Sequence, residues 1–173
     1  EKEHEVLERL TELRRRYNRK VSLIGWSLGG IYARELAWMA PESIRQVITL
    51  GTPIRHSRAV TVSWLYEDVT GQRESHMDPA LLARVPEPPP VPSTTVYSRT
   101  DGVVPWQCAI DKDAEQTENV RVEGSHIGLG FHPAVLWVIA DRLAQPEGEW
   151  RPFNRKGIKS IVYPRPDRLP PGI

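Results

Sequence analysis

The sequence predicts an α/β fold in which a parallel sheet carries helices on both faces. Short apolar segments alternate along the chain with longer amphipathic ones, and this alternation is typical of a parallel sheet. Length and composition agree with that fold class, because 173 residues with 39% hydrophobic and 26% charged content suit one ordinary globular domain.

The first third of the chain contains two predicted helices and two predicted strands. Apolar residues recur at spacings of four, three and four within 2–18, which predicts an amphipathic helix. Strands are expected at 21–24 and 46–50. A second helix over 30–40 lies between them, and Pro41 ends it because proline lacks the backbone N–H that a helix needs.

The remainder of the chain resumes the alternation after an interruption. Residues 54–92 break the pattern and close in a cluster of prolines, so we interpret them as a candidate cap insertion. Strands are then expected at 94–97 and 119–122, and a helix at 133–143. Residues 151–173 have little periodicity and predict an extended C-terminal tail.

The pentapeptide Gly25-Trp26-Ser27-Leu28-Gly29 has the form GxSxG. It follows a predicted strand and precedes a predicted helix, and this is the context in which such a pattern exposes a nucleophilic serine on a sharp turn. Small residues two positions before and after Ser27 allow the chain to turn tightly. The context favours serine-based acyl chemistry over a purely structural turn.

The segment GWSLGGIYARELA, followed by QVITLGTP, resembles the middle of an α/β hydrolase of the bacterial esterase/lipase type. The resemblance covers nearly all of residues 1–150 and implies a triad in the chain order Ser, Asp or Glu, His. It also implies several strands before the one that leads to the serine. Residues 1–150 are therefore expected to form the C-terminal part of a hydrolase domain, with the N-terminal strands missing from this chain.

Asp101 is the candidate acid of the triad. It follows the predicted strand at 94–97, and functional groups gather at the carboxyl ends of parallel strands. The stretch from Asp101 to Pro105 also resembles the acid loop of the family. A turn-forming Asp-Gly pair is the alternative interpretation, and Asp111 and Asp113 are reserve candidates.

His126 is the candidate base. It comes after the predicted strand at 119–122 and before the last helix, as the base of this fold does, and glycines on both sides let the imidazole reach towards the serine. His132, beside Pro133, is better explained as a residue at the helix terminus. Three further histidines precede the acid and are out of order for the role: His4, His56 and His76.

Leu28 follows the nucleophile, so its backbone N–H is the expected oxyanion-hole donor. By resemblance the second donor lies in a loop upstream of Glu1, and this chain alone is expected to be nearly inactive. The segment 51–53 also resembles a family segment near the site, but it is assigned no role in the reaction. Four residues are candidates for lining an apolar acyl pocket: Trp26, Trp64, Leu65 and Tyr66.

Charge and composition argue against several other classes of protein. A net charge of +1 provides no overall field for a polyanion, so nucleic-acid binding is not expected. The longest apolar stretch, near 134–140, is much shorter than the roughly 20 residues of a bilayer span, so any membrane role is expected to be peripheral. The single cysteine, Cys108, excludes an internal disulfide and is expected to be a packing residue.

No motif indicates a metal or a cofactor, since the sequence has no HExxH, no CxxC pair and no phosphate-binding loop. The chain begins at Glu1 with neither a methionine nor a basic-then-apolar leader, so a secretion signal is absent or not included. The cytoplasm is slightly favoured as the location, and the oligomeric state stays open.

We interpret the sequence as a hydrolase that cleaves carboxylic esters or lipids through an acyl-enzyme intermediate. Two alternatives stay open. The same acyl-enzyme can pass its acyl group to an alcohol or thiol, which would make the protein an acyltransferase, or the fold can serve as a non-catalytic binding module.

Overall fold

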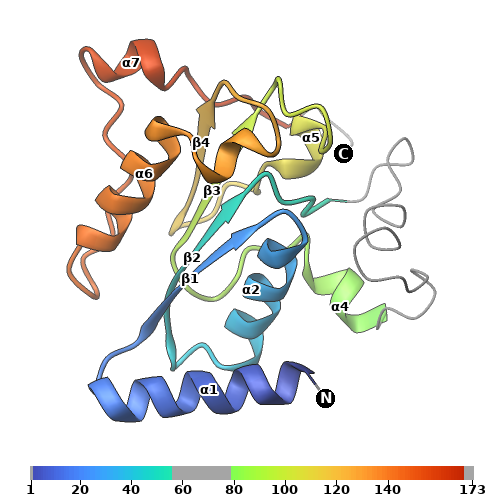
Figure 1. The fold of residues 1–173 in the computed structure, drawn as a ribbon, viewed down its shortest axis with the longest axis vertical. Coiled ribbons are helices and arrows are strands. Elements are labelled where there is room, and N and C mark those ends of the chain that lie inside the picture. The colour runs from blue at the N-terminus through green and yellow to red at the C-terminus, as the bar shows by residue number, and fades with distance from the viewer. Residues whose placement is uncertain (1, 56–78, 170–173) are drawn as a thin grey trace.

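The computed structural model describes residues 2–55 and 79–169, and four parallel strands in these residues form one sheet in the order β1-β2-β3-β4 (Figure 1). The strands match the four expected from the sequence: β1 (Val21–Trp26), β2 (Ile44–Leu50), β3 (Ser93–Ser98) and β4 (Thr117–Val122). All four strands run in the same direction, so their carboxyl ends lie at one edge of the sheet.

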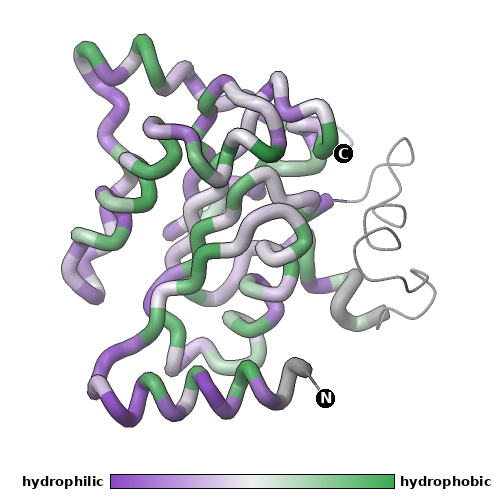
Figure 2. The backbone as a smooth tube through the Cα atoms, in the orientation of Figure 1, coloured by the Kyte–Doolittle hydropathy of each residue, from purple (hydrophilic) through white to green (hydrophobic). Residues whose placement is uncertain are grey.

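Helices cover both faces of this sheet, as the alternation predicts. The helices α1 (Lys2–Tyr17) and α2 (Leu28–Met39) pack on one face and α6 (Pro133–Ala144) on the other (Figure 1). Consecutive residues of β2 divide between the two layers, since side chains alternate along a strand. Val47 packs with Leu10 and Ala33, whereas Ile48 packs with Val135. Hydrophilic and hydrophobic residues alternate along α1 in Figure 2, the pattern of an amphipathic helix.

Three short helices and one turn of 3-10 helix complete the described chain. They are α4 (Pro79–Arg84), α5 (Trp106–Ala109), η2 (Gly128–Gly130) and α7 (Lys159–Val162). The helix α4 belongs to the candidate cap insertion. Most of that insertion, including Trp64, Leu65 and Tyr66, lies outside the described residues. No helix in the described ranges combines the length and the apolar character that crossing a bilayer requires.

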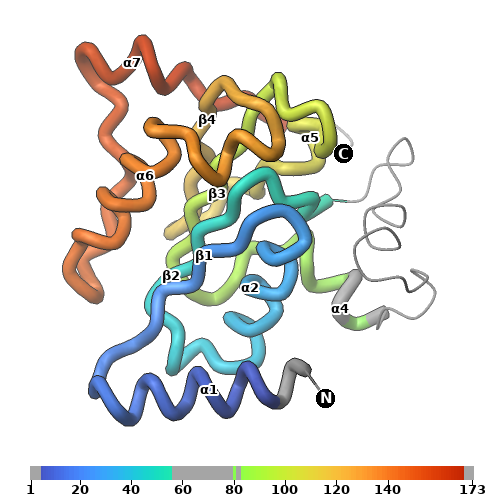
Figure 3. Tube along the Cα trace, in the orientation of Figure 1, coloured from blue at the N-terminus to red at the C-terminus, as the bar shows by residue number. Residues whose placement is uncertain are grey.

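Residues 151–169 have little regular structure apart from α7, and they pack against the sheet and α6. The tail runs back beside α6 in Figure 3. Phe153 and Tyr163 are buried in the same cluster as β4, and the Tyr163 hydroxyl donates a hydrogen bond of 2.9 Å to the Ala134 carbonyl. The segment that the sequence predicts as an extended arm is therefore anchored along its length.

A second anchor joins the tail to β3. The Tyr97 hydroxyl donates a 3.0 Å hydrogen bond to the Asp167 carboxylate, which also pairs with Arg99. Burial acts to raise the pKa of Asp167, but the hydrogen bonds from Arg99 and Tyr97 outweigh it and hold the pKa below its ordinary value. The contact therefore stabilises the docked tail above about pH 4, and it is lost as the pH falls through the lowered pKa.

Candidate active site

Ser27 occupies a strained turn between β1 and α2. Its φ of 53° and ψ of −127° lie outside the regions that residues other than glycine usually adopt. The Ser27 backbone N–H donates a 2.8 Å hydrogen bond to the Leu50 carbonyl, so the carboxyl ends of β1 and β2 meet at this turn. A partly exposed serine held in strained backbone at the edge of a parallel sheet has the geometry of a nucleophile elbow.

Two glycines, Gly25 and Gly30, allow the close packing around this turn. The sequence predicts this role for Gly25 and Gly29, so only Gly25 was expected. A Cβ on Gly25 would lie 2.4 Å from the Gly30 Cα, and a Cβ on Gly30 would lie 2.0 Å from Thr52 Oγ1. Gly29, the last residue of the pentapeptide, has nothing within 4 Å of its Cβ position. The close approach after the serine is therefore at Gly30, one residue later than the GxSxG spacing suggests.

Asp101 and His126 form a buried hydrogen-bonded pair. The Asp101 Oδ2 atom lies 2.8 Å from His126 Nδ1, and the side chains are 2% and 7% exposed. The other carboxylate oxygen of Asp101 accepts hydrogen bonds from the backbone N–H groups of Val103 and Val104, at 2.9 and 2.6 Å. The His126 backbone N–H donates to the Asp101 carbonyl at 2.8 Å. The carboxylate is thus fixed by its own turn and can hold the imidazole in one orientation.

The residue that precedes the serine joins the turn to His126. The Trp26 indole N–H donates a 3.1 Å hydrogen bond to the His126 carbonyl, and the two rings lie 5.7 Å apart between centroids. Within residues 2–55 and 79–169 no hydrogen bond links the Ser27 hydroxyl to His126. Contacts between a nucleophile and its base often tighten only when substrate binds.

Gly51 lies against both Asp101 and His126, although the sequence predicts no role in the reaction for the segment 51–53. Its φ is +52°, and a Cβ on it would lie 2.9 Å from Asp101 Oδ2 and 3.2 Å from His126 Nδ1. The sequence feature that could have indicated Gly51 is its position directly after β2. Nothing in the neighbouring sequence shows which side chains approach it. With Gly51, each of the four strands contributes a residue just beyond its carboxyl end to this site.

The reserve candidates lie in other environments. Asp111 pairs with Arg34 at 2.6 Å, both side chains being essentially inaccessible to solvent, and Arg34 also donates to the Val85 and Glu87 carbonyls. Asp113 is exposed. Neither carboxylate bonds to His126, so Asp101 is the acid that this arrangement favours.

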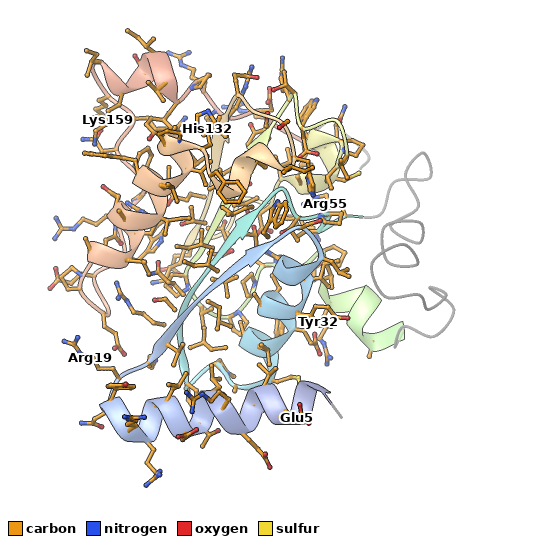
Figure 4. The ribbon with its side chains drawn as sticks, viewed as in Figure 1. Glu5, Arg19, Tyr32, Arg55, His132 and Lys159 are labelled. Atoms are coloured by element: carbon orange, nitrogen blue, oxygen red, sulfur yellow. The ribbon has the colours of Figure 1, made fainter. Side chains whose placement is uncertain are left out.

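The structure also tests the predictions for His132 and Cys108. The His132 side chain accepts a 3.1 Å hydrogen bond from the Ala134 N–H at the start of α6, which confirms it as a helix-terminus residue (Figure 4). Cys108 is 2% exposed and packs with Tyr97 and Ile110, which confirms it as a packing residue. The described part of the chain contains no group of three His, Cys, Asp or Glu residues that could hold a metal ion.

Leu28 begins α2, where the first backbone N–H groups have no partner within the helix. These groups and the helix dipole both favour negative charge at this end. The Leu28 N–H therefore stands where an oxyanion donor is expected, immediately after Ser27. Trp26, a candidate for the acyl pocket, is 42% exposed, and its indole N–H is bonded to the segment that carries His126.

The parallel sheet, its helices on both faces and the sharp turn after β1 are features of the α/β-hydrolase fold. Residues 4–122 match the family model described as a PGAP1-like alpha/beta domain. Because this match spans more than half of the chain, the protein belongs to that family. The predicted resemblance to the α/β-hydrolase superfamily is thereby confirmed.

Solved structures with the same fold include several named as lipases or esterases. A monoacylglycerol lipase from Paleococcus ferrophilus is 16% identical with a TM-score of 0.52, and the match covers 80% of this chain and 75% of the lipase. An α/β hydrolase from a lagoon-sediment metagenome is 17% identical with a TM-score of 0.51, over 82% of this chain and 68% of that one. An esterase domain of a Rhodothermus marinus protein is 21% identical with a TM-score of 0.51, over 71% and 58%.

At these identities the similarity shows the fold alone. No curated protein matches the chain.

Proposed function

We propose that this protein is a serine hydrolase that cleaves carboxylic esters through an acyl-enzyme intermediate. The observation that carries the proposal is the buried 2.8 Å contact between Asp101 and His126, at the sheet edge where the strained turn presents Ser27. Ser27 is the nucleophile, His126 the base, and Asp101 the residue that orients the imidazole. The family match and the neighbours named as lipases and esterases support an acyl ester or a lipid as substrate.

The reaction follows from these assignments. The Ser27 hydroxyl oxygen attacks the carbonyl carbon and its proton passes to His126 Nε2, while Asp101 stabilises the resulting imidazolium through Nδ1. The Leu28 N–H donates a hydrogen bond to the carbonyl oxygen as negative charge develops on it. The alcohol leaves with the proton from His126. A water molecule then attacks the acyl-enzyme, gives its proton to His126, and releases the carboxylic acid as Ser27 recovers its proton.

Labelling with a fluorophosphonate probe tests this proposal in the full-length protein. Such a probe modifies a serine activated by a neighbouring base, so mass spectrometry is expected to find the adduct on Ser27 together with turnover of a short-chain aryl ester. Absence of label on a folded sample would assign the protein to the non-catalytic binding modules. Label combined with preferential transfer of the acyl group to an added alcohol would identify an acyltransferase.

The variant Trp26→Phe distinguishes two possible roles of Trp26, which are to position His126 and to bind the substrate. Phe keeps an apolar ring but cannot donate the hydrogen bond to the His126 carbonyl. We expect kcat to fall about fivefold, the equivalent of one ordinary hydrogen bond, with KM little changed. Steady-state kinetics of the full-length protein on a soluble ester measure kcat and KM separately, and Trp137→Phe on the exposed side of α6 is the control. A rise in KM with kcat unchanged would instead make Trp26 part of the acyl pocket.

A further inference from the structure

The short helix α7 exposes apolar side chains along one face. Ile158, the N-cap residue before α7, and Ile161 and Val162 within the helix follow the i, i+3, i+4 spacing that places residues on one side of a helix. They are 83%, 79% and 48% exposed, and α7 buries none of its residues. A helix that packs on a protein core turns such a stripe inward, whereas this one turns it to solvent.

Cations are frequent in the segment that carries this apolar stripe. Residues 151–169 contain six Lys or Arg and only one acidic residue, Asp167, although the whole chain has a net charge of +1. Four of the cations stand near α7, and among the described residues none of them forms an ion pair: Arg155, Lys156, Lys159 and Arg165. The Lys159 ammonium lies 5.5 Å from the Trp137 ring centroid and 5.6 Å from that of Phe153. The segment that carries the exposed isoleucines is therefore more positively charged than the chain as a whole.

An open depression lies on the side of α7 that carries Ser160 and Tyr163. Its volume is about 760 Å³, and its lining includes Arg155, Lys156, Ser160 and Arg165. These groups are hydrogen-bond donors, and three of them are positively charged, so the depression suits an anionic group such as a phosphate. The Tyr163 hydroxyl, bonded to the Ala134 carbonyl, fixes the end of α7 to the start of α6. The stripe is thus held on the folded domain at the upper end of the view in Figure 1.

We propose that α7 and its surrounding cations form a docking surface for membranes that contain anionic phospholipids. Ile158, Ile161 and Val162 enter the boundary between headgroups and acyl chains, and the four cations bind the anionic headgroups. An apolar face bordered by Lys and Arg is the combination that places an amphipathic segment at such an interface. A soluble anion alone would use the cations but not the exposed isoleucines. The inference does not depend on the proposed ester chemistry, because binding is measured without turnover.

Co-sedimentation with vesicles tests this surface in the full-length protein. Binding is expected to vesicles of phosphatidylcholine with phosphatidylserine, to weaken as salt is raised, and to be far weaker to phosphatidylcholine alone. The double variant Ile158→Ser with Ile161→Ser should lose at least about tenfold in affinity. Lys156→Gln and Arg165→Gln should each lose about fivefold.

Tyr17→Ser and Arg19→Gln are the matched controls, since they remove an exposed aromatic residue and an exposed cation from the end of the molecule that carries α1. Circular dichroism verifies that each variant stays folded. Equal binding to neutral and anionic vesicles would overturn the proposal, and so would no binding to either. Loss of binding in the cation variants with full binding in the isoleucine variant would also overturn it, because that result describes a site for a soluble anion.

Discussion

Replacing Asp101 with Asn in the full-length protein is expected to lower kcat about 10⁴-fold while leaving the fold intact. The Asn side-chain oxygen can still accept the hydrogen bonds from the Val103 and Val104 N–H groups, so the turn after β3 keeps its shape. The amide nitrogen then replaces Oδ2 beside His126 Nδ1. Because an amide N–H donates, Nδ1 must accept, and the proton moves to Nε2, the atom that has to receive the proton from Ser27.

The matched variant is Asp111→Asn, which tests the rival carboxylate. Asp111 neutralises the buried Arg34, so its loss leaves an uncompensated charge in the interior and should cost about 3–5 kcal/mol of unfolding free energy. Protein that stays folded at low temperature should keep its turnover, since Asp111 does not contact His126. Thermal unfolding and ester kinetics on both variants separate the two roles. Full turnover in Asp101→Asn would remove Asp101 from the mechanism.

Local patterns in the sequence predict the sheet and the order of the proposed triad. The strands can be predicted because each is a short run of mostly apolar residues between helical segments. Such a run is visible in consecutive residues of the sequence. The turn at Ser27 can be predicted because the strand, the serine and the helix that form it follow one another directly in the sequence. Asp101 and His126 could be selected because the carboxyl ends of parallel strands share one edge, so their places after β3 and β4 already imply that they meet.

The features that escaped prediction depend on residues far apart in the chain. Gly51 matters because Asp101 and His126 approach it, and Gly30 because Thr52 does. Asp111 is tied to Arg34, 77 residues away. Such contacts leave no periodicity to detect. The four residues of α7 are likewise too few to show a helical repeat, and docking of the tail depends on Tyr97 and Tyr163, which give no local sign of their partners.

Changing Gly30 to Ala is expected to destabilise the fold by about 1–3 kcal/mol or more. The new methyl group would lie 2.0 Å from Thr52 Oγ1 and 2.8 Å from Thr52 Cβ. Thr52 is fully buried, so it has little room to move away. Gly29→Ala is the matched control one residue earlier, because nothing lies within 4 Å of its Cβ position and alanine is the better helix former by about 1 kcal/mol.

The two variants should therefore shift the unfolding temperature in opposite directions, by about 2–4 °C per kcal/mol for a chain of this size. Adding Thr52→Ala to Gly30→Ala removes the nearest atom but leaves the Cβ contact, so it should recover part of the loss. A double-mutant cycle measured by thermal unfolding gives this coupling energy. Equal stability of the Gly29 and Gly30 variants would show that the chain relaxes around Ser27, and that the strained turn is not held by the packing of Gly30 on Thr52.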